Sequence, residues 1–307
     1  MKISTTQFFQ QSVQQLGDLQ SGMAKTQTQM TSGKKITKPS DEPDKAAVLA
    51  RLQTGIARQE NYQTGIKQAN LRYSAEESAL TSASEMVTRI KELATQAAND
   101  TMSAQDRRTL GLEISNLRDQ LLSLGNSQDA NGTYLFAGSR AGQPAFGPDS
   151  TGQVRYLGDQ NRMMVSIGDN RSIHLNRPGS DVFVRVVRTD AKGEKQGVDF
   201  FQVLDDLTKA VNGSDQMSMQ RGLNEVDALQ NGLSEGLGQV GADQAAADAQ
   251  SSVLDQIILQ FKSYKSDVED LDYTEAVTRM NRDELALQAA QSSFAKISQL
   301  SLFKFLS

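Results

Sequence analysis

The sequence predicts a mainly α-helical protein with a small β insert, in a nested elongated architecture of paired terminal helices, a long helical rod and a central β domain. Three observations lead to this fold class. Both ends of the chain carry a narrow apolar stripe with helical spacing, and longer helical patterns lie inside them. The segment 131–197 differs in kind, because it holds 10 of the 23 glycines and three of the five prolines.

These patterns divide the chain into three expected domains. Residues 1–40 and 273–307 form a terminal helical coiled-coil domain, residues 41–140 and 198–272 a helical rod domain, and residues 141–197 a small β insert domain. Charge follows the same division, with a net charge of +4 at the N-terminal end, +1 at the C-terminal end and about −10 in the remainder. We therefore expect the two ends to face a different environment from the middle.

The N-terminal segment is expected to be a helix over residues 5–31 with the heptad spacing of a coiled coil. Most residues outside its stripe are Gln, Ser or Thr, so the helix buries too little apolar surface to be stable alone. Gly33 ends it, because glycine readily takes the left-handed conformation found after helices. The stripe consists of Phe9, Val13, Leu16, Gln20, Met23, Gln27 and Met30.

The C-terminal segment, residues 273–302, repeats the same alternation of steps of four and three residues. At about 1.5 Å per residue the two terminal helices have matched lengths of roughly 40 and 45 Å. Its stripe consists of Ala276, Met280, Asp283, Leu287, Ala290, Phe294, Ile297 and Ser301.

Matched stripes at opposite ends of the chain predict that the two terminal helices pair with each other. The alternative is that each helix packs on the central domain. If they pair, the apolar residues of both stripes form an assembly seam. The predicted seam is Phe9, Val13, Leu16, Met23, Met30, Ala276, Met280, Leu287, Ala290, Phe294 and Ile297.

Longer helices are expected inside the terminal pair. Residues 40–43, Ser-Asp-Glu-Pro, are a helix start signal, and apolar residues then recur with helical period to about Asn99. A second start lies at Ser103, with Asp106 three residues later in a capping-box spacing. An apolar stripe follows over residues 110–124.

Helical pattern returns after the central segment, over residues 200–211 and again over residues 217–270. We expect the end of the second helix to carry one apolar face. That face consists of Val253, Leu254, Ile257, Ile258, Phe261, Tyr264, Val268 and Leu271.

Short strands separated by turn residues are predicted for the middle of the chain. Asn131-Gly132 marks a turn, and residues 134–137 are expected to form a short strand. Alternating stretches predict further strands at 154–157, 163–167, 172–175 and 182–187.

No group of residues carries convincing chemistry. The chain has no cysteine and one histidine, which excludes disulfides, thiolate metal sites and histidine clusters. That residue, His174, lies in a predicted strand without nearby partners, so a structural role is expected. The adjacent carboxylates Glu76-Glu77 and Asp205-Asp206 point about 100° apart on a helix and are expected on solvated faces.

Composition excludes further classes of function. The acidic run 267–272 lacks the ligand order of an EF-hand loop, so a helix end is expected there. A net charge of −5 argues against nucleic-acid binding, and without a run of about 18 apolar residues we expect no membrane insertion. We therefore expect no catalytic, cofactor-binding or metal-binding residue, no cofactor, and a protein that is not an enzyme.

The class of function that remains is interaction with other proteins. The sequence resembles the bacterial flagellin family. The stretches that carry the resemblance cover both ends and the first helical half of the chain. They are the opening MKISTTQFFQQSV, MTSGKKITKPSDEPDKAA at 30–47, SAEESAL at 74–80, DANGTYLFAG at 129–138, DLDYTEAVTRM at 270–280 and AAQSSFAKISQLSLFKFL at 289–306.

The resemblance implies a structural protein that is exported unfolded through the flagellar secretion apparatus without a cleaved signal, and so an extracellular place on the flagellum. Within the family, the sequence is most similar to the subunits of the hook–filament junction. This resemblance implies a ring of subunits between the hook-side junction protein and flagellin, with a flagellar export chaperone as a further partner. Polar terminal helices agree with this, because such segments stay disordered alone and order on assembly.

Two other interpretations stay open. Flagellin itself, the filament subunit, shares the helical ends, although the opening and the PSDEP segment look more like the junction protein. A secreted coiled-coil protein with an unrecognised enzymatic activity is the alternative from a different class, and its test would be the loss of activity in His174→Ala.

Overall fold

The fold is mainly helical with small antiparallel sheets, which confirms the fold class that the sequence predicts. The structure, a computed structural model, describes the backbone of residues 2–189 and 194–306. Side chains lie outside the description at residues 2–6, 8 and 297–306.

The chain forms two compact units. The first comprises Met1–Gln59 and Gln256–Ser307, and the second comprises Glu60–Asp255. Two long helices contribute to both units, α2 over Pro43–Ala97 and α6 over Gln216–Glu269. The boundaries of the three domains expected from the sequence stay a prediction.

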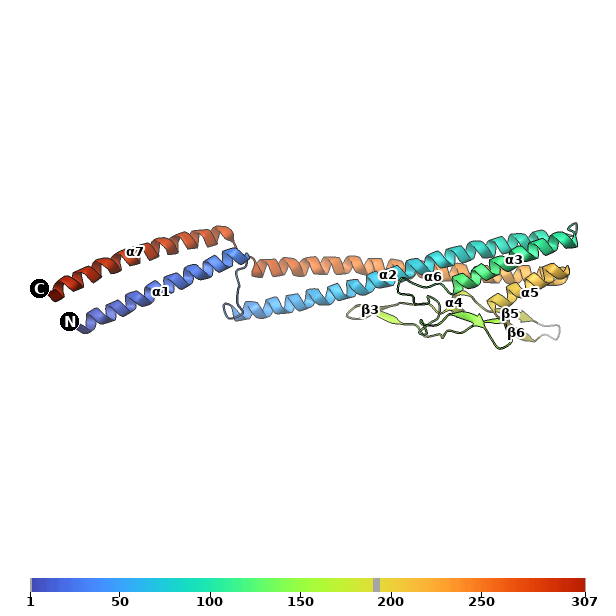
Figure 1. Ribbon diagram of the computed structural model, residues 1–307, viewed down its shortest axis with the longest axis horizontal. Coiled ribbons are helices and arrows are strands. Elements are labelled where there is room, and N and C mark those ends of the chain that lie inside the picture. Colours follow the sequence, from blue (N-terminus) through green and yellow to red (C-terminus); the bar gives the residue numbers. More distant parts are fainter. Residues whose placement is uncertain (1, 190–193, 307) are drawn as a thin grey trace. The chain divides into compact units, whose positions relative to one another are not determined.

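The first unit contains both ends of the chain as paired helices. Helix α1 spans Lys2–Ser32 and helix α7 spans Tyr273–Leu306, and the two lie side by side (Figure 1). They run antiparallel, because the start of α7 contacts the end of α1 and Phe294, further along α7, contacts Phe9. Both helices begin and end close to the predicted residues.

The predicted helix starts are observed. Helix α2 begins at Pro43, where a missing backbone N–H costs nothing in the first turn. Helix α3, Ala104–Gly125, begins after Ser103, whose hydroxyl oxygen accepts from the backbone N–H of Asp106. Just before α2, the Asp41 carboxylate accepts from the backbone N–H of Lys38.

In the second unit, helices α2 and α6 run antiparallel and are joined by polar pairs along their edges. The amide of Gln63 donates to the Asp255 carboxylate at 2.5 Å, and Lys91 lies 2.5 Å from the Asp227 carboxylate. Helix α3 packs against α5, Phe200–Gly213, so closely that a Cβ on Gly111 would lie 2.2 Å from the Asn212 side chain. Close helix approach therefore explains this buried glycine.

The described residues between α3 and α5 form three antiparallel two-stranded sheets, not one larger sheet. The pairs are β1 with β2, β3 with β4 and β5 with β6, each joining neighbours in the chain. A short helix, α4, lies between the second and third pairs. The bounds are β1 Phe146–Pro148, β2 Val154–Tyr156, β3 Met164–Gly168, β4 Arg171–His174, α4 Gly179–Val182, β5 Val186–Thr189 and β6 Lys195–Val198.

Some local predictions were wrong. Residues 134–137 form no strand: Tyr134 makes only an isolated bridge with Gln128, and the following buried residues pack into the core. The predicted strand at 182–187 is divided between the end of α4 and the start of β5. The predicted apolar face of α6 is incomplete, because Val253 is 45% and Tyr264 51% exposed.

One hydrophobic core joins the helices and the sheets of the second unit. Its centre is a group of aromatic rings contributed by the first sheet, by Phe183 directly after α4, and by α5. Phe146 lies 5.1 Å from Phe183 and 5.2 Å from Phe201 between ring centroids, in edge-to-face arrangements that favour aromatic pairs. The sheets, too small to be stable alone, are therefore stabilised by packing on the helices.

Two glycines of α6 test this packing. A Cβ on Gly232 would lie 2.6 Å from Val184 and 3.3 Å from the Val182 carbonyl oxygen, whereas a Cβ on Gly238 would meet nothing within 4 Å. We expect Gly238→Ala to stabilise the protein by about 0.5–1 kcal/mol through helix propensity. Gly232→Ala has the same gain but should lose about 1–3 kcal/mol through overpacking. Urea unfolding measures both, and equal effects would contradict the close packing at Gly232.

Candidate functional site

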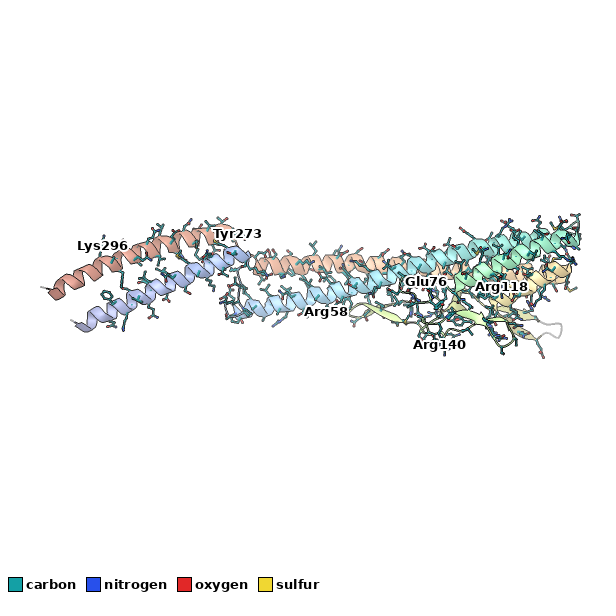
Figure 2. All side chains as sticks on the ribbon, in the orientation of Figure 1. Arg58, Glu76, Arg118, Arg140, Tyr273 and Lys296 are labelled. Carbon is teal, nitrogen blue, oxygen red and sulfur yellow. The ribbon has the colours of Figure 1, made fainter. Side chains whose placement is uncertain are left out.

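The contact between α1 and α7 is the first candidate site. The rings of Phe9 and Phe294 meet edge to face with centroids 5.1 Å apart. Near the other end, the Tyr273 hydroxyl donates to the backbone oxygen of Met30 at 3.1 Å, and Figure 2 shows Tyr273 at the start of α7. The two stripes thus meet within one chain, as the pairing hypothesis predicts.

The α7 side of the contact follows the predicted positions. Ala276 is fully buried, and five other members of the stripe are partly buried. These are Met280, Asp283, Leu287, Ala290 and Phe294. The side chain of Ile297, the last predicted member of the seam, lies outside the described residues.

The α1 side differs from the prediction at every second position. Val13 is 57% exposed, and Gln20 and Gln27 are exposed as well. Since position 19 is Leu and position 20 is Gln, turning the helix toward Leu19 buries more apolar surface. Among the described side chains, the partly or fully buried residues are Phe9, Ser12, Leu16, Leu19, Gly22, Met23, Thr26, Gln29 and Met30.

Polar side chains inside this contact bond to the backbone. Thr26 is 2% exposed, and its hydroxyl donates to the Gly22 carbonyl at 3.1 Å. Gln29 is 5% exposed, and its amide donates to the Lys35 carbonyl at 2.6 Å. Because buried polar groups are costly unless bonded, these contacts explain how a Gln- and Thr-rich helix can bury its inner face.

A short backbone bridge closes the end of the helix pair. Gly33 has φ of 70°, and its carbonyl accepts from the Leu271 N–H at 3.0 Å, while the Lys35 N–H donates to the Glu269 carbonyl at 2.7 Å. The Glu269 carboxylate contacts Lys34 Nζ at 2.6 Å, and that bond is the main reason why its pKa is lowered. The acidic run 267–272 is thus a helix end, as predicted, fixed by basic partners.

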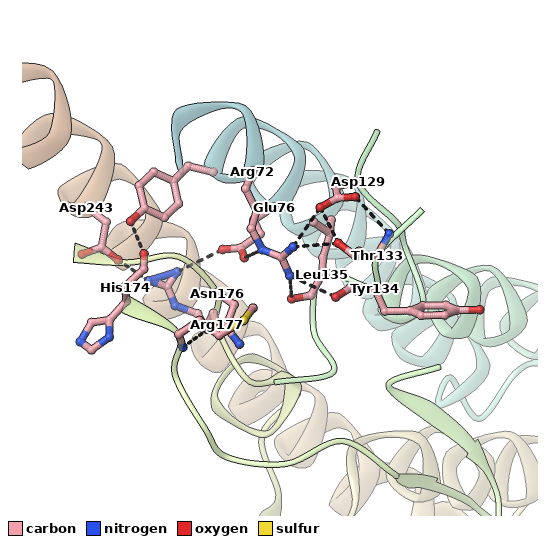
Figure 3. A network of polar contacts seen from close by, with 12 residues as sticks. Arg72, Glu76, Asp129, Thr133, Tyr134, Leu135, His174, Asn176, Arg177 and Asp243 are labelled. Carbon is pink, nitrogen blue, oxygen red and sulfur yellow. Dashed lines mark hydrogen bonds and ion pairs between the residues drawn. The ribbon is translucent and has the colours of Figure 1, made fainter. Parts of the chain in front are cut away.

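A second polar cluster lies in the other unit and was missed from the sequence. Glu76, expected on a solvated face, is 1% exposed. Its carboxylate oxygens lie 3.6 Å from Arg72 Nε and 3.8 Å from Arg177 Nη1 (Figure 3). Arg177 also lies 2.7 Å from Asp243 of α6. The burial of Glu76 had one signal in the sequence. This charged residue occupies an apolar position of the α2 stripe, between Tyr73 and Leu80.

Arg72 extends this cluster to the segment after α3. Its guanidinium lies 3.0 Å from the Asp129 carboxylate and donates to the backbone oxygens of Tyr134 at 3.0 Å and Leu135 at 2.8 Å. Arg72 therefore holds residues 129–135 against α2, in the place where the sequence predicted a strand. The planar fork of arginine suits several acceptors at once.

Burial dominates the protonation of Glu76. Desolvation raises its pKa to about 7, and the two arginines oppose this only in part. Both ion pairs are longer than a hydrogen bond, and the oxygen facing Arg72 has no hydrogen-bond partner among the described residues. A carboxylate taken out of water is destabilised relative to its neutral form, and the two arginines together with the backbone N–H of Arg177 offset only part of this effect.

The other candidate residues have structural contacts. The backbone oxygen of His174 accepts from the Tyr73 hydroxyl, and Figure 3 shows the imidazole turned away from the arginine cluster. Asp205 and Asp206 are partly buried, not fully solvated, and pair with Arg118 at 2.9 Å and Arg188 at 2.8 Å.

In the part of the chain that the structure describes, no three acidic or histidine side chains are grouped so that they could hold a metal ion. None of the described helices combines the length and apolar character needed to span a bilayer.

The fold is that of a mainly helical protein whose helices α1 and α7 pair along one seam. The chain matches the model of the bacterial flagellin N-terminal helical region over residues 3–141 and that of the C-terminal helical region over residues 223–306. It belongs to the bacterial flagellin family. The resemblance seen in the sequence is thus confirmed.

Within this family, the chain is similar over nearly its whole length to two proteins with the same name. The chain is 26% identical to flagellar hook-associated protein 3 of Escherichia coli (strain K12) over 317 residues, covering 99% of both chains. It is 27% identical to flagellar hook-associated protein 3 of Salmonella typhimurium over 318 residues, again covering 99% of both. These are the family members to which the opening of the sequence was most similar.

A solved structure shares the fold. The structure of a putative flagellar hook-associated protein from Vibrio parahaemolyticus superposes with a TM-score of 0.67 at 20% identity. The likeness covers 75% of this chain and 100% of that one.

The protonation of Glu76 gives a pH test. Its pKa is higher in the folded chain than the ordinary 4.5, so the folded state holds the proton more tightly between about pH 4.5 and 7. Stability should therefore be highest below this window and fall as pH rises through it, by roughly 1–3 kcal/mol. We expect Glu76→Gln to remove this fall, measured by urea unfolding at pH 5 and pH 7.5.

Other carboxylates with shifted pKa values do not confuse this test. Asp41, Asp129, Asp159 and Glu269 have lowered pKa values, so their contributions change below the window. An equal fall in wild type and Glu76→Gln would contradict the assignment to Glu76.

Proposed function

We propose that this chain is a structural subunit of the bacterial flagellum that assembles at the hook–filament junction and connects the hook-side junction protein to flagellin. The observation that carries the proposal is similarity over 99% of the chain to proteins named flagellar hook-associated protein 3. The paired terminal helices support it, because they offer a polar, extended surface and no catalytic group.

The proposal includes a ring of identical subunits as the assembled form, with flagellin and the hook-side junction protein as its neighbours. An export chaperone and transit through the flagellar export apparatus, without a cleaved signal, belong to the same proposal. Two features support export in an unfolded state. Helices α1 and α7 have narrow apolar stripes that stabilise them only when paired, and the chain has no cysteine that could form a disulfide.

The seam residues would act in assembly by holding α1 and α7 as one body. In this proposal Phe9, Leu16, Leu287 and Phe294 fix the two helices to each other, and the exposed outer faces contact other subunits. Val13, predicted as a seam residue, is available to such contacts because it is 57% exposed. The division into an inner and an outer face is what allows one helix pair to serve both roles.

Gene deletion tests the proposed place in the flagellum. A strain lacking this chain should assemble hooks without filaments and release unpolymerised flagellin into the medium, as seen by electron microscopy and in culture supernatants. Loss of filament mass with an intact junction, and many copies of this chain along the filament, would instead support the flagellin alternative.

A substitution in the seam tests the role of the helix pair. Phe294 loses its ring contact with Phe9 on change to Asp, and burial of such a side chain contributes roughly 1.5–3 kcal/mol. We expect Phe294→Asp, expressed in the deletion strain, to abolish motility while the second unit melts nearly as before. Swimming assays and thermal melting of the secreted protein measure the two effects.

Gln291→Asp is the matched control, because residue 291 is exposed and lies outside the seam. It introduces the same charge three residues away and should leave motility largely intact. Normal swimming with Phe294→Asp, or equal damage from Gln291→Asp, would contradict the assigned seam.

A further inference from the structure

Three Asn-Gly dipeptides occur in the chain, at residues 131–132, 212–213 and 231–232. This dipeptide is prone to deamidation, because the backbone nitrogen of a glycine, which carries no side chain, can attack the carboxamide carbon of the preceding asparagine. The attack closes a five-membered succinimide ring and needs the two groups to approach each other. Local structure therefore decides which of the three dipeptides can react.

Two of the three dipeptides lie in helices. Asn231 is in the interior of α6, where each backbone N–H bonds to the carbonyl four residues earlier. Asn212 lies near the end of α5, with its carboxamide oxygen 2.2 Å from the place that a Cβ on Gly111 of α3 would occupy. Helical side chains tilt toward the N-terminus of their helix, away from the nitrogen of the next residue. We therefore expect both asparagines to be protected.

Asn131 has no such protection from a helix. It lies in an exposed turn between α3 and β1, and its carboxamide makes no hydrogen bond to the described residues. Gly132 has φ of 76°, and a Cβ on it would meet nothing within 4 Å. Both reacting groups are thus open to solvent and free of steric hindrance.

Hydrogen bonds to Asp129 hold this turn closed. The Asp129 carboxylate accepts from the backbone N–H of Asn131 at 2.8 Å and of Thr133 at 3.1 Å. Its backbone oxygen accepts from the N–H of Gly132 at 2.9 Å, and this bond must break before the Gly132 nitrogen can attack. Arg72, whose side chain is 6% exposed, donates to the other oxygen of the Asp129 carboxylate at 3.0 Å (Figure 3). Opening of the turn therefore works against charged hydrogen bonds.

We propose that Asn131 deamidates spontaneously, at a rate set by the contact of Asp129 with Arg72. When the turn opens, the Gly132 nitrogen bonds to the carboxamide carbon of Asn131, and its proton passes to the leaving nitrogen, which departs as ammonia. Water then opens the succinimide at either carbonyl and leaves aspartate or isoaspartate at position 131. Water is the only other reactant. The inference is independent of the proposed place in the flagellum.

Incubation of the full chain at pH 8.5 and 37 °C tests the site. Peptide mass spectrometry follows all three asparagines, and digestion in isotopically labelled water marks any deamidation that occurs after the incubation. We expect Asn131 to convert at least tenfold faster than Asn212 and Asn231, with more isoaspartate than aspartate in the product. No conversion of Asn131, or conversion of Asn231 at the same rate, would overturn the proposal.

Asp129→Ala tests what sets the rate. The change removes the contact with Arg72 and the bonds from the backbone N–H groups of Asn131 and Thr133, so conversion should be several-fold faster in the folded protein. In urea, where the turn is absent, wild type and variant should convert equally fast. Circular dichroism checks that the variant is folded. If it is not, Thr133→Val is the milder test, because it loses only the hydroxyl bonds to Asp129 and Arg72. An unchanged rate in the folded variant would refute the role of Asp129.

A second turn supplies the matched control. In the turn 149–153, the Asp149 carboxylate accepts from the N–H of Thr151 at 2.7 Å and of Gln153 at 3.1 Å, and its backbone oxygen accepts from Gly152 at 3.0 Å. The bonds are the same, but threonine stands where the first turn has asparagine. Asp149→Ala should therefore leave the conversion of Asn131 unchanged. Equal acceleration by this variant would show that general loss of stability, and not the Asp129 contact, sets the rate.

Discussion

The scarcity of apolar side chains in the terminal helices is the constraint on which the first unit depends. Helices α1 and α7 each bury a single narrow stripe, and isolated helices of this polarity are marginal in water. The contact of Phe9 with Phe294 and the backbone bridge at Gly33 and Leu271 hold the pair at its two ends. Pairing, not helix propensity, therefore stabilises this part of the chain.

The second unit has the opposite character, because it owns a continuous core. Aromatic rings from the first sheet, α4 and α5 fill it, and Arg72 and Arg177 fasten the irregular segments to α2 and α6 around the buried Glu76. Burying three charges costs several kcal/mol unless each is paired, and the long contacts of Glu76 recover that cost only in part. The cluster fixes which segments meet, at the expense of stability above neutral pH.

This contrast between the two units fits a subunit of the flagellin family. A unit with its own core is stable by itself, whereas each helix of a pair with a minimal seam depends on its partner. Val13 of α1 and Leu285 of α7 are exposed, so apolar side chains remain on the outer faces of the helix pair.

Sequence periodicity was sufficient to predict the helices, and Pro43, Ser103 and Gly33 mark helix ends through local chemistry. On α7, Ala276 and Phe294 share one partly buried face, whereas on α1 the exposed Val13 and the partly buried Leu19 show that two heptad choices one residue apart could be told apart only by packing on α7. Arg72 and Glu76 are one helical turn apart on α2, but Arg177 reaches Glu76 from a segment about a hundred residues away, so the burial of this cluster depends on the folded arrangement of α2, α6 and the sheets. The irregular path of residues 129–137 follows from the same cause, because long-range hydrogen bonds to Arg72 replace the strand pairing that local sequence favours.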